Sequence, residues 1–292
     1  MKCRICLGWA WFLGAAALLG GESRRWTNLE GVEIVAEFVS QDAAAGEVTI
    51  RRKGRDFTLE IAKLSEADRS WLEQQAAAEA RANAVSEHAG QVRSFTSEGE
   101  HRVTYHVSYP PQYRESQPPP MIIMFSPGGN GRGILGTVKA AAAELGWIAV
   151  GCDVFRNGVD SEILDPKFEE MLPHLEKTVT HDPQRLYLGG MSGGALRAYQ
   201  YTEKFDRPWK GVFAMGGWLG GATRLDCPRK MAVVIANGDK DEAANSHNAS
   251  VIEILEGRRC KVEVMGFPGG HVTAPPEIAL KALRWIDEKT DA

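Results

Sequence analysis

A series of short apolar runs, most of them followed by a segment with helical periodicity, constrains the fold of this chain more than any other sequence feature. The run MIIMF at 121–125 is apolar throughout, which is typical of a strand buried on both faces of a parallel sheet. Further strands are predicted at 91–97, 101–108, 147–152, 185–190, 211–216, 231–238 and 261–267, and helices at 135–145, 166–179 (interrupted at Pro173), 193–205, 243–257 and 276–289. This alternation predicts an α/β fold, with a mostly parallel sheet and helices on both faces.

Composition argues against several classes of protein. Of the 292 residues, 43% are apolar and 25% are charged, which is the mix of an ordinary globular protein with about two domains. The 34 Lys and Arg residues face 38 Asp and Glu residues, so the net charge of −4 does not favour a nucleic-acid partner. The sequence has no dinucleotide-binding or Walker motif and no histidine–cysteine cluster with zinc spacing. We therefore expect neither a cofactor nor a metal.

The first 21 residues have the features of a secretory signal peptide. Lys2 and Arg4 precede an uncharged, mostly apolar run at 5–19, and small residues follow before charge returns. The run is shorter than the roughly 20 residues of a membrane-spanning helix. We expect residues 1–21 to be removed and the protein to be secreted or periplasmic. An uncleaved membrane anchor is the alternative.

Residues 22–73 are expected to form a small β unit. Alternate residues of VEIVAEFV share one apolar face, which is strand periodicity. Strands are predicted at 32–39, 47–52 and 55–61, the last two joined by a two-residue turn at Lys53-Gly54. The sequence SEAD at 65–68 matches a helix capping box. The helix that it begins is expected to run to about Ala89, so that residues 74–90 form a helical linker.

The stretches RRWTNLEGVEIVAEFV and GEVTIRRKGRDFTLEIAKLSEADRSWL cover most of this unit and resemble the Sla homology domain, first described in a yeast endocytic adaptor. Shared features are Arg25-Trp26-Thr27, Gly31, the central hairpin, and Leu64-Ser65 with Asp68. The resemblance implies an SH3-like barrel. The adaptor's domain binds a peptide sorting motif that a secreted protein would not meet, so the partner expected here is another peptide or a polymer. A tether or packing role is the alternative.

The sequence GGMSGGA at 189–195 places Ser192 in a GxSxG motif between an apolar strand and a helix. In that context the motif is typical of a strained strand-to-helix turn that exposes a nucleophilic serine. Gly190 and Gly194 are needed because side chains at these positions would collide with neighbouring backbone. We predict that Ser192 is a catalytic nucleophile.

Its partners are expected in two later loops. The sequence GDKDE at 238–242 follows the next-to-last strand, and such loops are where parallel sheets place their sites. Asp241 is the preferred acid, with Asp239 as the alternative. His271, in FPGGH after the last strand, is the predicted general base because two glycines leave it room to reach the serine. The chain order serine, acid, histidine is that of α/β hydrolases.

The sequences RLYLGGMSGGALRA, GDKDE and FPGGH together resemble the α/β-hydrolase superfamily, and the resemblance covers residues 91–290. Within the superfamily they are similar to secreted esterases of the feruloyl-esterase and polyhydroxybutyrate-depolymerase-like group. The resemblance implies a serine carboxylic-ester hydrolase with an acyl-enzyme intermediate.

The oxyanion loop departs from the family pattern, since Ser126-Pro127 replaces the usual His-Gly. Pro127 has no amide hydrogen, so the loop donor is expected from Gly128 or Gly129. The second donor is expected to be the amide of Gly193, just after the nucleophile.

The short interval between Ser192 and Asp241 leaves no room for a cap domain, so we expect an open site suited to a polymeric or bulky ester. Trp218 and Leu219 are expected to line it. A serine peptidase of the same fold and a catalytically inactive binding protein are the alternatives. The intact set of three residues argues against the second.

Three cysteines remain once residues 1–21 are removed. Cys227 and Cys260 each precede one of two strands expected to be parallel neighbours, so a disulfide between them is feasible in a secreted chain. Cys152 is then expected to be a free thiol. Three unpaired, buried cysteines are the alternative.

Overall fold

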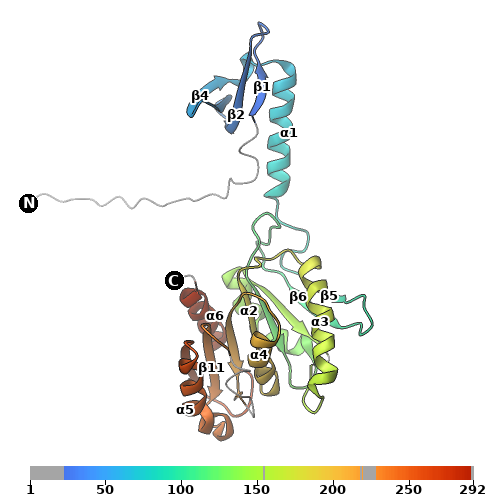
Figure 1. Cartoon of the computed structure of the whole chain (residues 1–292), viewed down its shortest axis with the longest axis vertical. Coiled ribbons are helices and arrows are strands. Elements are labelled where there is room, and N and C mark those ends of the chain that lie inside the picture. Colours follow the sequence, from blue (N-terminus) through green and yellow to red (C-terminus); the bar gives the residue numbers. More distant parts are fainter. Residues whose placement is uncertain (1–22, 154, 218, 220–227, 291–292) are drawn as a thin grey trace, which may run out of the picture. The chain divides into compact units, whose positions relative to one another are not determined.

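The computed structural model of the chain describes residues 23–153, 155–217, 219 and 228–290. The predicted signal peptide, Trp218 and Cys227 therefore lie outside the described residues. The chain divides into two compact units, Met1–Arg81 and Ala82–Ala292, each described below by itself (Figure 1). Among the described helices, none combines the length and apolar character that crossing a membrane requires.

The first unit is built on a four-stranded antiparallel sheet in the order β1-β2-β3-β4. Its elements are β1 (Ser23–Thr27), β2 (Glu33–Asp42), β3 (Glu47–Arg52), β4 (Arg55–Glu60), the short helix η1 (Ile61–Lys63) and helix α1 (Glu66–Ala82). The predicted two-residue hairpin turn is confirmed, because Arg52 pairs with Arg55. Lys53 and Gly54 both have positive φ, at 51° and 74°, as a turn that follows the twist of the strands requires.

The start of α1 is capped as the sequence predicts. The amide of Asp68 donates to Ser65 Oγ at 3.2 Å, which satisfies one of the free amides of the first turn. The Asp68 carboxylate also accepts from the amide of Thr27 and pairs with Arg24, so it ties α1 to β1. Leu72 of α1 is buried with Trp26 in the core of this unit. The first half of α1 is therefore part of the core of this unit.

The predicted helix to about Ala89 is too long, since α1 ends at Ala82. The next residues form turns whose amides bind carbonyls of the second unit: Ser86 N donates to Tyr113 O, and Gly90 N to Pro110 O. These bonds replace the helical ones, so residues 83–90 belong to the second unit.

The second unit contains an eight-stranded sheet in the order β12-β11-β10-β9-β7-β8-β6-β5. Its strands are β5 (Val92–Thr96), β6 (Thr104–Ser108), β7 (Met121–Phe125), β8 (Ile148–Cys152), β9 (Leu186–Met191), β10 (Trp209–Met215), β11 (Ala232–Gly238) and β12 (Lys261–Phe267). The six strands from β7 onward are parallel to one another, while β5 and β6 are added antiparallel at one edge. The predicted mostly parallel sheet is confirmed.

Among the described residues, five helices cover this sheet: α2 (Gly131–Leu145), α3 (Ser161–Thr178), α4 (Gly193–Lys204), α5 (Glu242–Gly257) and α6 (Pro276–Thr290). Buried residues of α2 and α6 pack on one face, and those of α3, α4 and α5 on the other (Figure 1). Helix α3 differs from the prediction because it starts at Ser161 and continues through Pro173. The buried side chains of Phe168, Leu172 and Leu175 hold it against the sheet on both sides of the proline, which offsets the lost backbone bond.

Candidate active site

Ser192 lies in a sharp turn between β9 and α4. Its φ of 56° and ψ of −121° fall in a region that non-glycine residues rarely adopt. The neighbouring glycines are required by close packing, as the sequence predicts. A Cβ on Gly190 would lie 2.7 Å from the carbonyl oxygen of Phe125, and one on Gly194 would lie 2.1 Å from it. The turn therefore presses against the end of β7 and holds Ser192 at the edge of the sheet.

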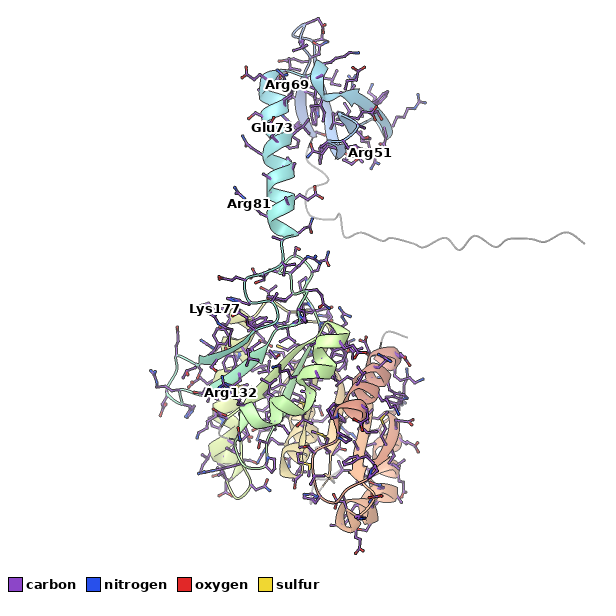
Figure 2. All side chains as sticks on the ribbon, turned by 180° about the vertical axis from the view of Figure 1, so that it is seen from behind. Arg51, Arg69, Glu73, Arg81, Arg132 and Lys177 are labelled. Carbon is purple, nitrogen blue, oxygen red and sulfur yellow. The ribbon has the colours of Figure 1, made fainter. Side chains whose placement is uncertain are left out.

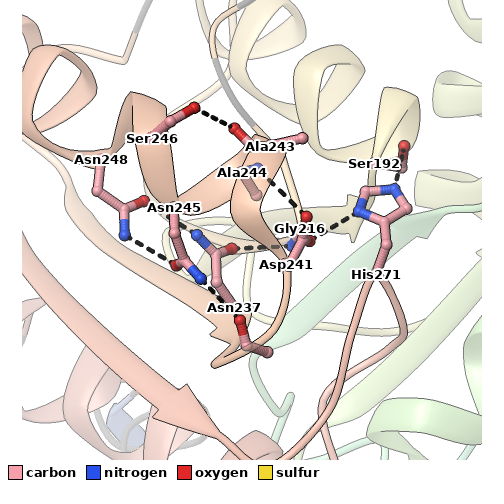
Figure 3. A network of polar contacts seen from close by, with 11 residues as sticks. Ser192, Gly216, Asn237, Asp241, Ala243, Ala244, Asn245, Ser246, Asn248 and His271 are labelled. Atoms are coloured by element: carbon pink, nitrogen blue, oxygen red, sulfur yellow. Dashed lines mark hydrogen bonds and ion pairs between the residues drawn. The ribbon is translucent and has the colours of Figure 1, made fainter.

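Ser192, His271 and Asp241 form an unbroken hydrogen-bonded chain (Figure 3). His271 Nε2 lies 3.0 Å from Ser192 Oγ, and His271 Nδ1 lies 2.7 Å from Asp241 Oδ2. The three residues follow the carboxyl ends of β9, β12 and β11, so the sheet brings together groups that are distant in the sequence. Such a chain is the arrangement that activates a serine hydroxyl.

Burial differs along this chain. The Asp241 side chain is 3% exposed, whereas the imidazole of His271 is 44% exposed. A buried carboxylate against one ring nitrogen orients the imidazole, while the other nitrogen stays accessible. The described part of the site is thus open at His271.

Asp239, the alternative acid, makes a different contact. Its Oδ1 accepts from the amide of Gly269 at 2.9 Å, and no bond joins it to His271. Asp241 instead shares its carboxylate between His271 and the amide of Ala244, which caps α5. Asp239 braces the loop that carries the histidine, whereas Asp241 contacts the ring.

Several supporting residues were missed by sequence reasoning. Asn237 is 1% exposed and accepts from the amide of Gly216 at 3.1 Å, while its own amide donates to Asn248 (Figure 3). Asn245 extends this network by donating to Gly238 O. Gly216 has a φ of 52°, which favours glycine, and a Cβ at this position would lie 3.2 Å from His271 Nδ1, so a side chain here would crowd the ring. The sequence signal that could have found Asn237 is its position as a polar residue near the end of an otherwise apolar strand.

The amides expected to bind an oxyanion are in two different states. No described residue accepts a hydrogen bond from the amide of Gly193, which opens α4. Gly128 N donates to Ser126 Oγ at 3.2 Å, and Gly129 N donates to Ser126 O at 3.4 Å. The acceptor of the Gly128 amide is the Ser126 hydroxyl, which can turn away by rotation about one side-chain torsion, whereas the acceptor of the Gly129 amide is a backbone carbonyl. The amide of Gly128 is therefore the more easily freed to bind an oxyanion.

Asp153 fixes the start of α2, next to the oxyanion loop. Its Oδ1 accepts from the amide of Gly131 at 2.8 Å, and its Oδ2 lies 3.2 Å from His106 Nε2. His106 is held on its other side by Ser94 at 2.7 Å. Sequence reasoning did not find this cluster, because Ser94, His106 and Asp153 are single residues in separate segments of the chain. It connects the antiparallel edge strands to the oxyanion loop.

The expected substrate-lining residues are only partly described. Trp218 lies outside the described residues, and Leu219 is 4% exposed within the core beneath α3, α4 and α5. Leu219 therefore presents almost no surface to a substrate, in contrast to the expectation. No group of three or more metal-ligating side chains occurs within the described ranges.

The described cysteines lie in buried positions. Burial raises the pKa of the Cys152 thiol and of the Cys260 thiol. Cys260 Sγ donates to Pro228 O at 3.2 Å. Strands β11 and β12 are parallel neighbours, as the disulfide hypothesis requires, but Cys227 lies outside the described residues and the bridge stays a prediction.

No family model and no curated protein matches the sequence. Solved structures do match. A ferulic acid esterase aligns with a TM-score of 0.51 and 17% identity over 68% of this chain and 96% of that one. The feruloyl esterase module from Clostridium thermocellum aligns with a TM-score of 0.53 and 12% identity over 72% of this chain and 90% of that one. Est1E from Butyrivibrio proteoclasticus aligns with a TM-score of 0.54 and 12% identity over 68% of this chain and 99% of that one. At these identities the likeness shows the fold alone, which is that of the α/β hydrolases.

Proposed function

We propose that this protein is a serine hydrolase that cleaves carboxylic esters through Ser192, His271 and Asp241. The observation that carries the proposal is the hydrogen-bonded chain from Asp241 through His271 to a serine held in a strained strand-to-helix turn. The esterase names of several solved structures with this fold support the same class of reaction.

In the proposed reaction, His271 Nε2 takes the proton of Ser192 Oγ as the oxygen attacks the ester carbonyl carbon. Asp241 stabilises the resulting imidazolium, which then protonates the leaving alcohol and leaves an acyl-enzyme. Water activated by the same imidazole hydrolyses the acyl-enzyme and restores Ser192.

The oxyanion is proposed to bind the amides of Gly193 and Gly128. The first has no acceptor among the described residues, and the second is released when the Ser126 hydroxyl rotates away. The amide of Gly193 is thus a donor already in place, whereas the amide of Gly128 becomes one after the Ser126 hydroxyl rotates. Both would stabilise the negative charge that develops on the carbonyl oxygen.

A fluorophosphonate probe and a panel of acetyl, feruloyl and hydroxyalkanoate esters test this proposal. Labelling and hydrolysis are both expected to disappear in Ser192→Ala, with turnover reduced by a factor of about 10⁴ or more. Ser250→Ala, a change of another serine on the outer part of α5, is the matched control and should label normally. Retention of most activity in Ser192→Ala would remove the serine-hydrolase proposal. A preference for peptides over the matched esters would assign the site to a peptidase.

We also propose that residues 22–73 form an SH3-like barrel of the Sla homology type that binds a peptide or a polymer. The four-stranded antiparallel sheet and its buried Trp26 are compatible with that proposal. The test is to measure binding of the isolated unit to an array of peptides and polysaccharides. If it binds none of them, a tether role is favoured instead.

Residues 1–21 are proposed to direct export. N-terminal sequencing of the protein recovered from its natural host tests this, because removal by signal peptidase leaves a chain that starts near residue 22. A mature protein that begins at Met1 contradicts the proposal.

A further inference from the structure

A hollow of about 680 Å³ lies beside the oxyanion loop. Its wall includes Gly128 and Gly129 of that loop, Asp153 at the end of β8, Arg156 after it, and Lys167 of α3. The volume falls within the range of small-ligand sites. A smaller hollow of about 180 Å³ also borders on Arg156 and reaches Gly193. Arg156 therefore lines the space next to both amides proposed to bind the oxyanion.

Two cations line the larger hollow without a partner. Neither Arg156 nor Lys167 makes a hydrogen bond or ion pair with another side chain in the part of the chain that the structure describes. The Lys167 side chain is partly buried and the Arg156 side chain is exposed, and the apolar residues Val159 and Ile163 line the same hollow. A cation without a partner in the described part of the protein is available to pair with an anionic group of a ligand.

The acid that lines the hollow, Asp153, already makes two polar contacts. Asp153 accepts from the amide of Gly131 and contacts His106, so both of its oxygens are occupied. On α3, Asp165 is paired with Lys204 and Tyr201, and Glu176 is paired with Arg207. Among the residues that line the hollow, the cations Arg156 and Lys167 outnumber the single carboxylate of Asp153, so the wall keeps a net positive charge.

The backbone places Arg156 rigidly against the oxyanion loop. Arg156 forms a β-bridge with Gly128, and the next amide, of Asn157, donates to Pro127 O at 2.9 Å. A carbonyl held at the oxyanion loop would thus lie near the backbone of Arg156, whose long side chain lines the hollow next to the loop.

The sheet order indicates which part of an ester faces these cations. His271 follows β12, on one side of β9, and must lie next to the leaving oxygen in order to protonate it. The hollow adjoins the ends of β7 and β8, on the opposite side of β9. The alcohol group therefore extends toward His271, and the acyl group toward Arg156 and Lys167.

We propose that the preferred substrates are esters whose acyl part carries a carboxylate at its far end, bound by Arg156 and Lys167. This inference rests on the proposed ester hydrolysis. The carboxylate would accept hydrogen bonds from the planar guanidinium and from the ammonium, which are the charge-assisted pairs that proteins use for such groups.

Two nearly isosteric substrates test the proposal, monoethyl adipate and ethyl hexanoate, in which a methyl group replaces the carboxylate. Released ethanol is measured for both, and monoethyl glutarate, pimelate and suberate vary the reach. The full-length protein is expected to have a higher kcat/KM for the carboxylate ester. Arg156→Gln and Lys167→Gln should each lower the ratio of the two kcat/KM values by about 10-fold, because each removes one charge-assisted bond.

Arg132→Gln and Lys177→Gln are the matched controls. Figure 2 labels both residues, Arg132 in the first turn of α2 and Lys177 in the last turn of α3, and neither lines the hollow. The ratio should not change in either variant.

The outcomes separate this inference from the function on which it rests. Hydrolysis of ethyl hexanoate without preference for any carboxylate ester overturns the inference and leaves the esterase intact. Absence of hydrolysis with all esters, together with absence of fluorophosphonate labelling, overturns both. If the two variants affect 6-acetoxyhexanoate, whose carboxylate is on the alcohol side, more than monoethyl adipate, the acyl-side assignment is overturned.

Discussion

Two acidic residues two positions apart in one loop have separate tasks. Asp241 is buried and contacts the imidazole of His271, while Asp239 is exposed and holds the amide of Gly269. The difference arises because Asp241 caps α5 and points back toward the sheet, whereas Asp239 faces the loop after β12. The position of Asp241 at the start of α5, and not a chemical difference between the two carboxylates, therefore decides which of them contacts His271.

Asp241→Asn is expected to reduce turnover by about 10⁴-fold, because an amide in its place favours the wrong tautomer of His271. Asp239→Asn keeps an oxygen that accepts from Gly269 and should cost less than about 10-fold. Ester turnover and the thermal midpoint are measured for both variants. The reverse order of effects would move the role of the acid to Asp239.

The oxyanion loop makes a second prediction at this scale. In this structure the Ser126 hydroxyl accepts a hydrogen bond from the amide of Gly128 at 3.2 Å. Ser126→Ala removes this competitor, so kcat/KM is expected to rise by up to about 10-fold, the equivalent of one neutral hydrogen bond. A large fall in kcat/KM would instead show that the hydroxyl itself serves the reaction.

At the scale of elements, α3 holds the loop between β5 and β6. The Glu170 carboxylate accepts from Ser97 Oγ and from the amides of His101 and Arg102. The hydrogen bond from Ser97 is the largest cause that lowers the pKa of Glu170 from its ordinary value of 4.5. The ionised form is therefore favoured in the folded state.

The sign of the pH dependence follows from that lowered pKa. The stabilisation by Glu170 is fully present above the ordinary value of 4.5 and is lost as the pH falls through the lower, folded value. Glu170→Gln is expected to lower the thermal midpoint at neutral pH and to show less acid destabilisation than the wild type between about pH 3 and 5. Thermal unfolding is followed across this range.

Glu169→Gln, a change of the exposed neighbouring residue on the same helix, is the control. Its unfolding should follow the wild-type pH dependence. If the two variants behave alike, the contacts of Glu170 do not stabilise the loop.

At the scale of the whole molecule, all proposed catalytic groups lie in the second unit, which begins at Ala82. Residues 83–90 contribute to that unit through the bond from Ser86 N to Tyr113 O and through the contact of His88 with Tyr109, whose ring centroids are 5.3 Å apart. The boundary of the catalytic unit therefore precedes these residues.

A chain that starts at Ala82 is expected to hydrolyse small soluble esters at the full-length rate. A chain that starts at Gly90 lacks the Ser86 and His88 contacts and should unfold at a lower temperature, with a loss of about 1–3 kcal/mol. Activity and thermal unfolding of both chains are compared with the full-length protein. An insoluble or inactive chain from Ala82 would place the first unit inside the catalytic core.

The local features of the fold were determined by the sequence itself. Apolar runs predicted the strands within a few residues, and the bounds of β7 and β12 agree with the prediction. Ser192 is predicted as the nucleophile because its glycines are needed in a turn whose geometry is local, and His271 is predicted as the base because it follows the last strand. The turn at Lys53-Gly54 was predicted for the same reason, since two residues alone determine its dihedral angles.

Contacts between distant segments were decided only by the tertiary structure. The sequence favours Asp241 but keeps Asp239 as the alternative because both follow β11. Only the folded loop, in which Asp241 begins α5 and Asp239 holds the amide of Gly269, decides which carboxylate meets His271. The end of α1 and the continuity of α3 through Pro173 depend on packing partners far along the chain, which override local helix propensity. Arg156 and Lys167 come together for the same reason, since the loop after β8 is drawn against the oxyanion loop by backbone bonds to Pro127 and Gly128 that no sequence pattern announces.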